Sequence, residues 1–207
     1  MSISKIKNNK TNKKVSKLFS GGFTLIETIV AIFILSLTIG ALLTLTTGGI
    51  YSVRYARNQI VADNLMQESL EYLRNERDKA AQAGLTWDQW LQTLNVSESG
   101  TPVDMSTPRG CFRDDGCIVD PYTTSSPIKE CQQVCSIVLF YPDHGFYGYD
   151  TFYPFGTPTF VPTSFVRKIH VVRTAPDQLV VEALITWQNG LNAKSVEQSM
   201  TLTNWHI

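Results

Sequence analysis

The chain has 207 residues, of which 43% are hydrophobic and 17% are charged, and its formal net charge is zero. This length predicts one ordinary domain plus an extra segment, and this composition excludes a disordered tail. The charge is uneven, because six lysines and no acidic residue lie in residues 1–22. The remaining chain has 12 basic and 18 acidic residues, a net charge of −6, which excludes the basic body expected of a nucleic-acid-binding protein.

An abrupt change in character separates residues 1–22 from residues 23–50. The first segment is polar, rich in lysine and asparagine, and ends in two glycines, whereas the 28 residues from Phe23 to Ile50 carry one charge, Glu27. As a helix with a rise of about 1.5 Å per residue, the second segment is roughly 42 Å long and can cross a bilayer. Because the lysines precede it, we expect the N-terminus in the cytoplasm and the residues after Ile50 outside.

A secretory signal peptide and a plain membrane anchor are the simpler interpretations of this segment. A signal peptide has a short apolar stretch followed by small residues, whereas here the small residues precede a long apolar stretch. A plain anchor explains the length and the lysines but not Glu27. A carboxylate inside a membrane helix costs about 2.5–3.5 kcal/mol on insertion scales, so it usually marks a function.

Residues 21–27 have the sequence Gly-Gly-Phe-Thr-Leu-Ile-Glu, which resembles the class III signal of type IV prepilins and type II secretion pseudopilins. All seven positions match, and a basic leader precedes them. The resemblance implies that a prepilin peptidase cleaves after Gly22 and that the new N-terminal residue, Phe23, is N-methylated. It also implies that Glu27, the fifth residue of the mature chain, is needed for assembly.

The chemistry of the cleaved chain is consistent with this resemblance. Cleavage after Gly22 creates a cationic amine on Phe23, and Glu27 lies four residues further on, on the same helical face. The carboxylate and the amine of neighbouring subunits can satisfy each other in an apolar bundle, which offsets the cost of burying each and fixes their axial register. Glycine at the cleavage position lets an extended backbone enter a narrow protease site.

The helix is expected to continue far beyond the apolar segment, because no proline occurs between Met1 and Thr101. We expect it to run to about Gln82 and to stop at Gly84. Its amphipathic part has an apolar stripe that we expect to pack on a sheet rather than to form a binding groove. The stripe consists of Ala62, Leu65, Met66, Ser69, Leu70 and Leu73. Residues 62–78 resemble the corresponding helix of PilV-like minor pilins, which favours a minor over a major subunit.

Gly40, Gly48 and Gly49 interrupt the apolar segment, and each glycine costs about 1 kcal/mol in a helix interior. Two interpretations remain open. The glycines let the helix bend or melt locally when it moves from lipid into a filament, or they let a neighbouring helix pack closely.

The globular part, residues 85–207, begins with a capping box in which Thr86 is the cap and Gln89 is its third position. It predicts a short helix to about Leu94, whose buried side chains are Trp87, Trp90, Leu91 and Leu94. Four β-rich runs come later, at Ser136–Tyr141, Val166–Thr174, Leu179–Trp187 and Ser195–Thr203. Short turns join the last three into an antiparallel meander. We therefore predict an α+β, type IV pilin-like fold, with a long N-terminal helix packed on an antiparallel β-sheet meander.

An aromatic segment lies between Pro142 and Pro162, among glycines and prolines. Its aromatic residues include Tyr147, Tyr149, Phe152, Tyr153, Phe155 and Phe160. We expect a long loop folded over a small second core. The alternative is an exposed surface that binds sugars or a partner subunit.

Four cysteines, Cys111, Cys117, Cys131 and Cys135, allow three pairings, among which the sequence does not choose. We favour disulfides over zinc because we expect this part of the chain outside the cell, and because the spacings differ from the C-x2-C of zinc ribbons. Classical major pilins carry their disulfide near the C-terminus. No cysteine follows Cys135, so that loop is absent here.

Catalytic motifs are not recognisable in this sequence. Asp143 beside His144, the pair Asp114 and Asp115, and Asp120 are candidates for acid–base chemistry or for calcium. They lie in turn-like contexts, where aspartate is ordinary, and no EF-hand spacing supports a calcium site. We therefore expect no enzyme activity, no metal site and no cofactor.

These expectations together describe a structural minor pilin. Its parts are a cleaved leader (1–22), a transmembrane and assembly half of the helix (23–50), an amphipathic half (51–84) and an extracytoplasmic domain (85–207). The expected partners are other pilin subunits, the prepilin peptidase and methyltransferase, the inner-membrane assembly platform, and membrane lipid before assembly. A type II secretion pseudopilin and a filament-displayed adhesin or receptor module remain alternatives.

Overall fold

The computed structural model describes residues 22, 24–123, 126–149, 159–190 and 192–205. The expectations for the leader, residues 1–21, and for Phe23 therefore lie outside the described residues. The chain divides into two units, residues 1–50 and 51–207. Helix α1, Leu25–Gln82, contributes residues to both.

Helix α1 ends where the sequence predicts, and its C-terminal cap explains why. Gly84 has φ of +75°, a left-handed conformation that glycine adopts without strain. The Leu85 N–H donates to the Ala80 carbonyl and the Gly84 N–H to the Ala81 carbonyl, both at 3.0 Å. These two bonds form a Schellman motif, which satisfies carbonyls that the last turn leaves free.

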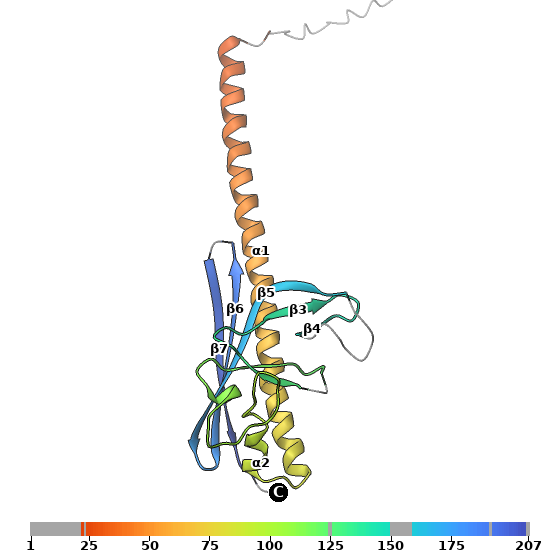
Figure 1. Ribbon diagram of the computed structural model, residues 1–207. Helices are drawn as coiled ribbons and strands as arrows, with labels where there is room; N and C mark the ends of the chain where they lie inside the picture. Colours follow the sequence, from red (N-terminus) through yellow and green to blue (C-terminus); the bar gives the residue numbers. More distant parts are fainter. Residues whose placement is uncertain (1–21, 23, 124–125, 150–158, 191, 206–207) are drawn as a thin grey trace, which may run out of the picture. The chain divides into compact units, whose positions relative to one another are not determined.

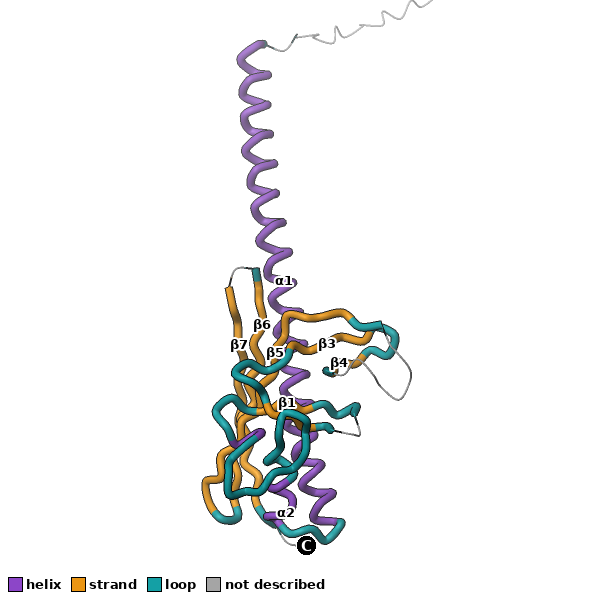
Figure 2. Tube along the Cα trace, in the orientation of Figure 1, coloured by secondary structure: helices purple, strands orange, loops and turns teal. Residues whose placement is uncertain are grey.

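The described part of residues 51–207 contains one seven-stranded antiparallel sheet beside the second half of α1 (Figures 1 and 2). Its strands are β1 Cys117–Val119, β2 Ile128–Glu130, β3 Ile137–Tyr141, β4 Phe146–Gly148, β5 Val161–Ala175, β6 Gln178–Asn189 and β7 Asn192–Thr203. Strand β5 pairs with β6 along one edge and with β3 and β1 along the other, and β7 pairs with β6. The predicted α+β arrangement of a long helix on an antiparallel meander is confirmed.

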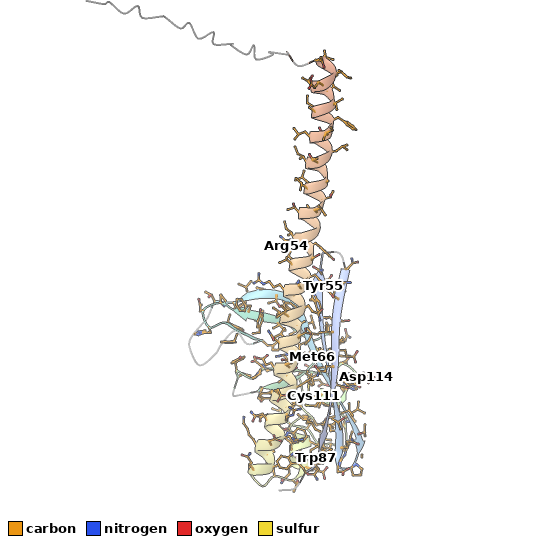
Figure 3. The ribbon with its side chains drawn as sticks, turned by 180° about the vertical axis from the view of Figure 1, so that it is seen from behind. Arg54, Tyr55, Met66, Trp87, Cys111 and Asp114 are labelled. Carbon is orange, nitrogen blue, oxygen red and sulfur yellow. A yellow bond between two sulfur atoms is a disulfide. The ribbon has the colours of Figure 1, made fainter. Side chains whose placement is uncertain are left out.

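The main core lies between α1 and one face of this sheet. All six residues of the predicted stripe are buried, and Figure 3 labels one of them, Met66. Alternate residues of β5 and β6 form the opposing surface, which comprises Phe165, Ile169, Val171, Leu179, Val181, Ala183, Ile185 and Trp187. The prediction that the stripe packs on a sheet is therefore confirmed.

Helix α2, Trp87–Gln92, starts with the predicted capping box. The Thr86 hydroxyl accepts a hydrogen bond from the Gln89 N–H at 3.3 Å, and the Gln89 side chain accepts one from the Thr86 N–H at 2.8 Å. The four side chains predicted to be buried, Trp87, Trp90, Leu91 and Leu94, are all buried. The helix stops two residues before Leu94 because the backbone N–H groups of Thr93 and Leu94 bond to carbonyls three residues earlier, at 2.9 and 3.0 Å, which tightens the last turn.

Two disulfides, Cys111–Cys117 and Cys131–Cys135, each close a short local loop. The expectation of disulfides rather than zinc is confirmed, and the pairing that the sequence left open is local. The second bridge closes a loop in which Gln133 has φ of 55°, unusual for a residue other than glycine.

The aromatic segment is only partly the loop that the sequence predicts. Residues Phe146–Gly148 form β4 against β3, and β5 already begins at Val161. A tight turn causes the difference, because the Gly145 N–H donates to the Tyr141 carbonyl at 2.8 Å and returns the chain onto β3. Phe146 then stacks on buried Tyr141 with ring centroids 4.7 Å apart, in a small cluster with Leu139. The described aromatic residues expected in a second core lie elsewhere, because Tyr147 and Tyr149 pack against the main core and Phe160 is 41% exposed. The expectations for Phe152, Tyr153 and Phe155 lie outside the described residues.

Candidate functional site

The first half of α1 exposes apolar side chains all around the helix. The large apolar side chains from Leu25 to Ile50 are 48% to 77% exposed. By length and composition, α1 can cross a membrane. Exposed apolar surface on this scale is unfavourable in water and indicates a lipid or protein environment that covers it.

The hydroxyl groups in this segment are satisfied by the helix itself. Thr28, Ser36 and Thr38 donate to carbonyls three or four residues earlier at 2.7 to 2.8 Å. Thr44 and Thr46 do the same, at 2.8 and 2.7 Å. Such bonds remove the cost of placing a free donor in an apolar medium. The sequence alone did not indicate this property.

Glu27 contrasts with these hydroxyls. Its backbone N–H donates to the Thr24 side-chain oxygen at 3.3 Å, so Thr24 caps the helix. Its carboxylate has no hydrogen-bond or ionic partner among the described residues. The position in the first turn favours a carboxylate through the helix dipole, and no described residue occupies the carboxylate, so its negative charge is available to a cation.

The glycines of this region have no packing role in the described part of the chain. A Cβ atom added at Gly22, Gly40, Gly48 or Gly49 meets no atom within 4 Å. Helix α1 also passes through the last three without a break. The described contacts give no reason for glycine at these positions, so both interpretations of the helical glycines stay open.

Arg167 is a buried charge that the sequence did not lead us to expect. Its side chain on β5 is fully buried, and its Nη1 atom donates to the Glu68 carboxylate at 2.7 Å and to the Leu65 carbonyl at 3.1 Å. Its Nη2 atom donates to the Val119 carbonyl, and its Nε atom donates to the Tyr149 hydroxyl at 3.2 Å. Burial by itself lowers the pKa of Arg167, but Tyr149 and Glu68 reverse this effect, so the side chain stays charged. One guanidinium thus joins α1, β1 and β5.

A sequence signal for this residue existed. Arg167 occupies an inward position of an alternating strand, between Phe165 and Ile169. A basic residue in such a position predicts a buried ionic contact.

The candidate acid–base and calcium residues serve separate local contacts. Asp115 pairs with Arg113 at 2.8 Å, and the Asp114 carbonyl accepts a bond from Lys168 at 3.1 Å. Buried Asp120 accepts two backbone N–H groups. Asp143 accepts a bond from the Thr159 hydroxyl, and His144 lies near the ring of Phe146. Within the described ranges, no three His, Cys, Asp or Glu side chains form a group that could hold a metal ion.

A cleft of about 470 Å³ lies between the end of α1, α2 and the segment before β2. Its lining is mainly apolar and includes Tyr72 and Trp90, while Glu76 and Lys79 form an ion pair at 2.8 Å beside it. This volume is sufficient for a small ligand. Nothing in its chemistry selects a ligand class.

No protein-family model, curated protein or solved structure matches this chain. Its function must therefore be inferred from the residues themselves.

Proposed function

We propose that the chain is a minor subunit of a type IV pilus or a related filament. A prepilin peptidase removes residues 1–22, the new N-terminus at Phe23 is methylated, and α1 then leaves the inner membrane to join a bundle of subunit helices. The observation that carries this proposal is an exposed apolar helix with Glu27 in its first turn, a carboxylate that has no partner among the described residues.

The apolar half of α1 is suited to two environments in turn. Lipid covers it before assembly, and the same half of other subunits covers it afterwards. Because its hydroxyls already bond to its own carbonyls, transfer between the two environments breaks none of these hydrogen bonds.

Glu27 supplies the specific contact in this bundle. Its carboxylate neutralises the Phe23 amine of a neighbouring subunit. Each charge alone is costly to bury, whereas the pair is tolerated and fixes how far one helix is displaced along the next.

The rest of the chain supports an extracytoplasmic position for residues 51–207. Six lysines precede the span, which favours a cytoplasmic N-terminus. Both disulfides lie in this part of the chain, and disulfides persist in oxidising compartments. A type II secretion pseudopilin meets the same requirements, so the filament in which the processed chain is found distinguishes the two.

The decisive experiment is the intact mass of the chain purified from membranes of cells that contain a prepilin peptidase. We expect a chain that begins at Phe23 and carries one additional methyl group. Gly22→Leu should remain uncut, whereas the control Gly40→Ala should be cut normally, because Gly40 lies beyond the cleavage signal. An unprocessed wild-type chain in these cells would contradict the proposal.

A further inference from the structure

Four side chains just beyond the apolar segment form a distinct group on α1. Tyr51, Arg54, Tyr55 and Arg57 are all exposed, with 49% of Tyr51 and 39% of Tyr55 accessible. No described residue forms a hydrogen bond or an ion pair with any of them, although Arg57 acts electrostatically on the Tyr147 hydroxyl. Figure 3 shows Arg54 and Tyr55 on the helix. We call this group the interfacial collar.

The unpaired arginines are exceptional in this protein. The chain has eight arginines, all in the described ranges, and the other six each lie within 4 Å of a carboxylate. Along the helix, no acidic residue occurs between Glu27 and Asp63. Among the described residues, Arg54 and Arg57 therefore have no carboxylate within one helical turn, which leaves their charges available to a group on another molecule.

The position of the collar along the helix indicates which molecule that is. A hydrocarbon core of about 30 Å takes about 20 helical residues. Counted from Glu27, the first charge, it ends near Thr47. The collar then begins roughly 6 Å beyond the hydrocarbon and extends to roughly 15 Å. This region holds the lipid headgroups, and the long arginine side chains can reach back into it.

The chemistry of the collar matches a headgroup layer. A guanidinium binds phosphate oxygens through two parallel N–H bonds. Tyrosine is enriched at membrane interfaces because its ring is apolar and its hydroxyl is polar. Tyr51 lies one helical turn before Arg54 (i, i+3) and Tyr55 (i, i+4), so its ring neighbours both side chains on the helix surface.

We propose that the interfacial collar binds the phosphate groups of outer-leaflet lipids and thereby sets the depth of α1 in the membrane before assembly. The proposal rests on the membrane-held precursor proposed above. Two arginines on the outer side oppose the orientation that the leader lysines favour, and phosphate contacts compensate for this cost. A fixed depth also holds Gly22 and Glu27 at the cytoplasmic surface.

Solid-state NMR tests this contact directly. The full uncut chain, with labelled arginine, is reconstituted into phosphatidylethanolamine and phosphatidylglycerol vesicles in phosphate-free buffer, and the dephasing of guanidinium carbons by lipid phosphorus is measured. We expect dephasing in the wild type and its loss in Arg54→Gln/Arg57→Gln. The control Arg74→Gln should retain the wild-type dephasing, because Arg74 is paired with Glu71 and lies about 30 Å further along the helix.

Two outcomes would overturn the proposal: no dephasing in the wild type, or unchanged dephasing in the double variant. A double variant that enters filaments poorly although the wild type shows no lipid contact would assign the arginines to a neighbouring subunit. Circular dichroism of each variant checks that it is folded, and Arg54→Lys/Arg57→Lys should keep part of the dephasing because it keeps the charges. No peptidase is present, so failure of lipid contact is distinct from failure of processing.

Discussion

The two halves of helix α1 differ in where their side chains find partners. In the first half, apolar side chains are exposed, hydroxyls bond to the helix backbone, and Glu27 has no described partner. In the second half, an apolar stripe is buried on the sheet, Arg74 pairs with Glu71, and Glu68 pairs with Arg167. The second half is thus stabilised within the chain, whereas the first half needs other molecules. Substitutions in the two halves should therefore affect different measurements.

The largest expected effect on folding is at Arg167. Arg167→Ala leaves the Glu68 carboxylate and the Leu65 and Val119 carbonyls without their donor, and we expect a loss of about 3–5 kcal/mol in the free energy of unfolding. Chemical denaturation of the chain in detergent measures this loss. Arg173→Ala, which removes an exposed pair with Asp88, should cost no more than about 1 kcal/mol. Equal losses in both variants would refute the role given to Arg167.

A leucine pair tests the difference between the halves most directly. Leu73→Ala removes a fully buried side chain and should destabilise the domain by about 2–5 kcal/mol. Leu43, at 63% exposure, should tolerate the same change within about 0.5 kcal/mol in the same unfolding assay. A similar loss at Leu43 would mean that the first half contributes to the core.

Glu27→Gln should impair assembly without destabilising the domain, the opposite of what we expect for Leu73→Ala. Unfolding of the domain should be unchanged, because the Glu27 side chain touches no described partner. Incorporation into filaments should fall roughly a hundredfold. The substitution leaves the Phe23 amine of the neighbouring subunit without its carboxylate, and such an uncompensated charge costs about 3 kcal/mol in an apolar bundle. Quantitative immunoblotting of sheared filaments measures incorporation. Glu71→Gln, on the same helix, should be incorporated normally; equal defects would remove the special role of Glu27.

The smallest effect is expected at Thr38. Thr38→Val keeps the shape of the side chain and removes a hydroxyl that bonds only to its own helix. Membrane insertion and filament incorporation should both change by less than about 1 kcal/mol. A large assembly defect would show that this hydroxyl also bonds to another helix, contrary to the comparison of the two halves.

Much of the fold could be predicted because its signals are local. The stripe from Ala62 to Leu73, the Thr86 capping box and the stop at Gly84 each depend on residues a few positions apart. Strands β1, β2 and β4 have three residues each, too few for an alternating pattern, and were not predicted. Their pairing depends on distant segments, as does the choice among cysteine pairings.

The candidate site shows the same division. Gly22 and Glu27 belong to a short linear pattern that the sequence reveals directly. The collar could not be predicted from the sequence, because the contrast of Arg54 and Arg57 with the other six arginines depends on which described carboxylates those six contact in three dimensions. The buried contacts of Arg167 could not be predicted either, because they depend on which face of β5 packs against α1.

The side-chain hydroxyls in the first half of α1 donate to carbonyls of the same helix, and this affects how different subunits can pack together. Because these hydroxyls need no partner on a neighbouring helix, they do not favour any particular rotation of one helix about its axis relative to the next. In the filament proposed above, closely related but non-identical subunits could then occupy adjacent places in the same stack, provided that each supplies the acid and the terminal amine. If the proposed function holds, a rare subunit could substitute for an abundant one without a dedicated lateral interface.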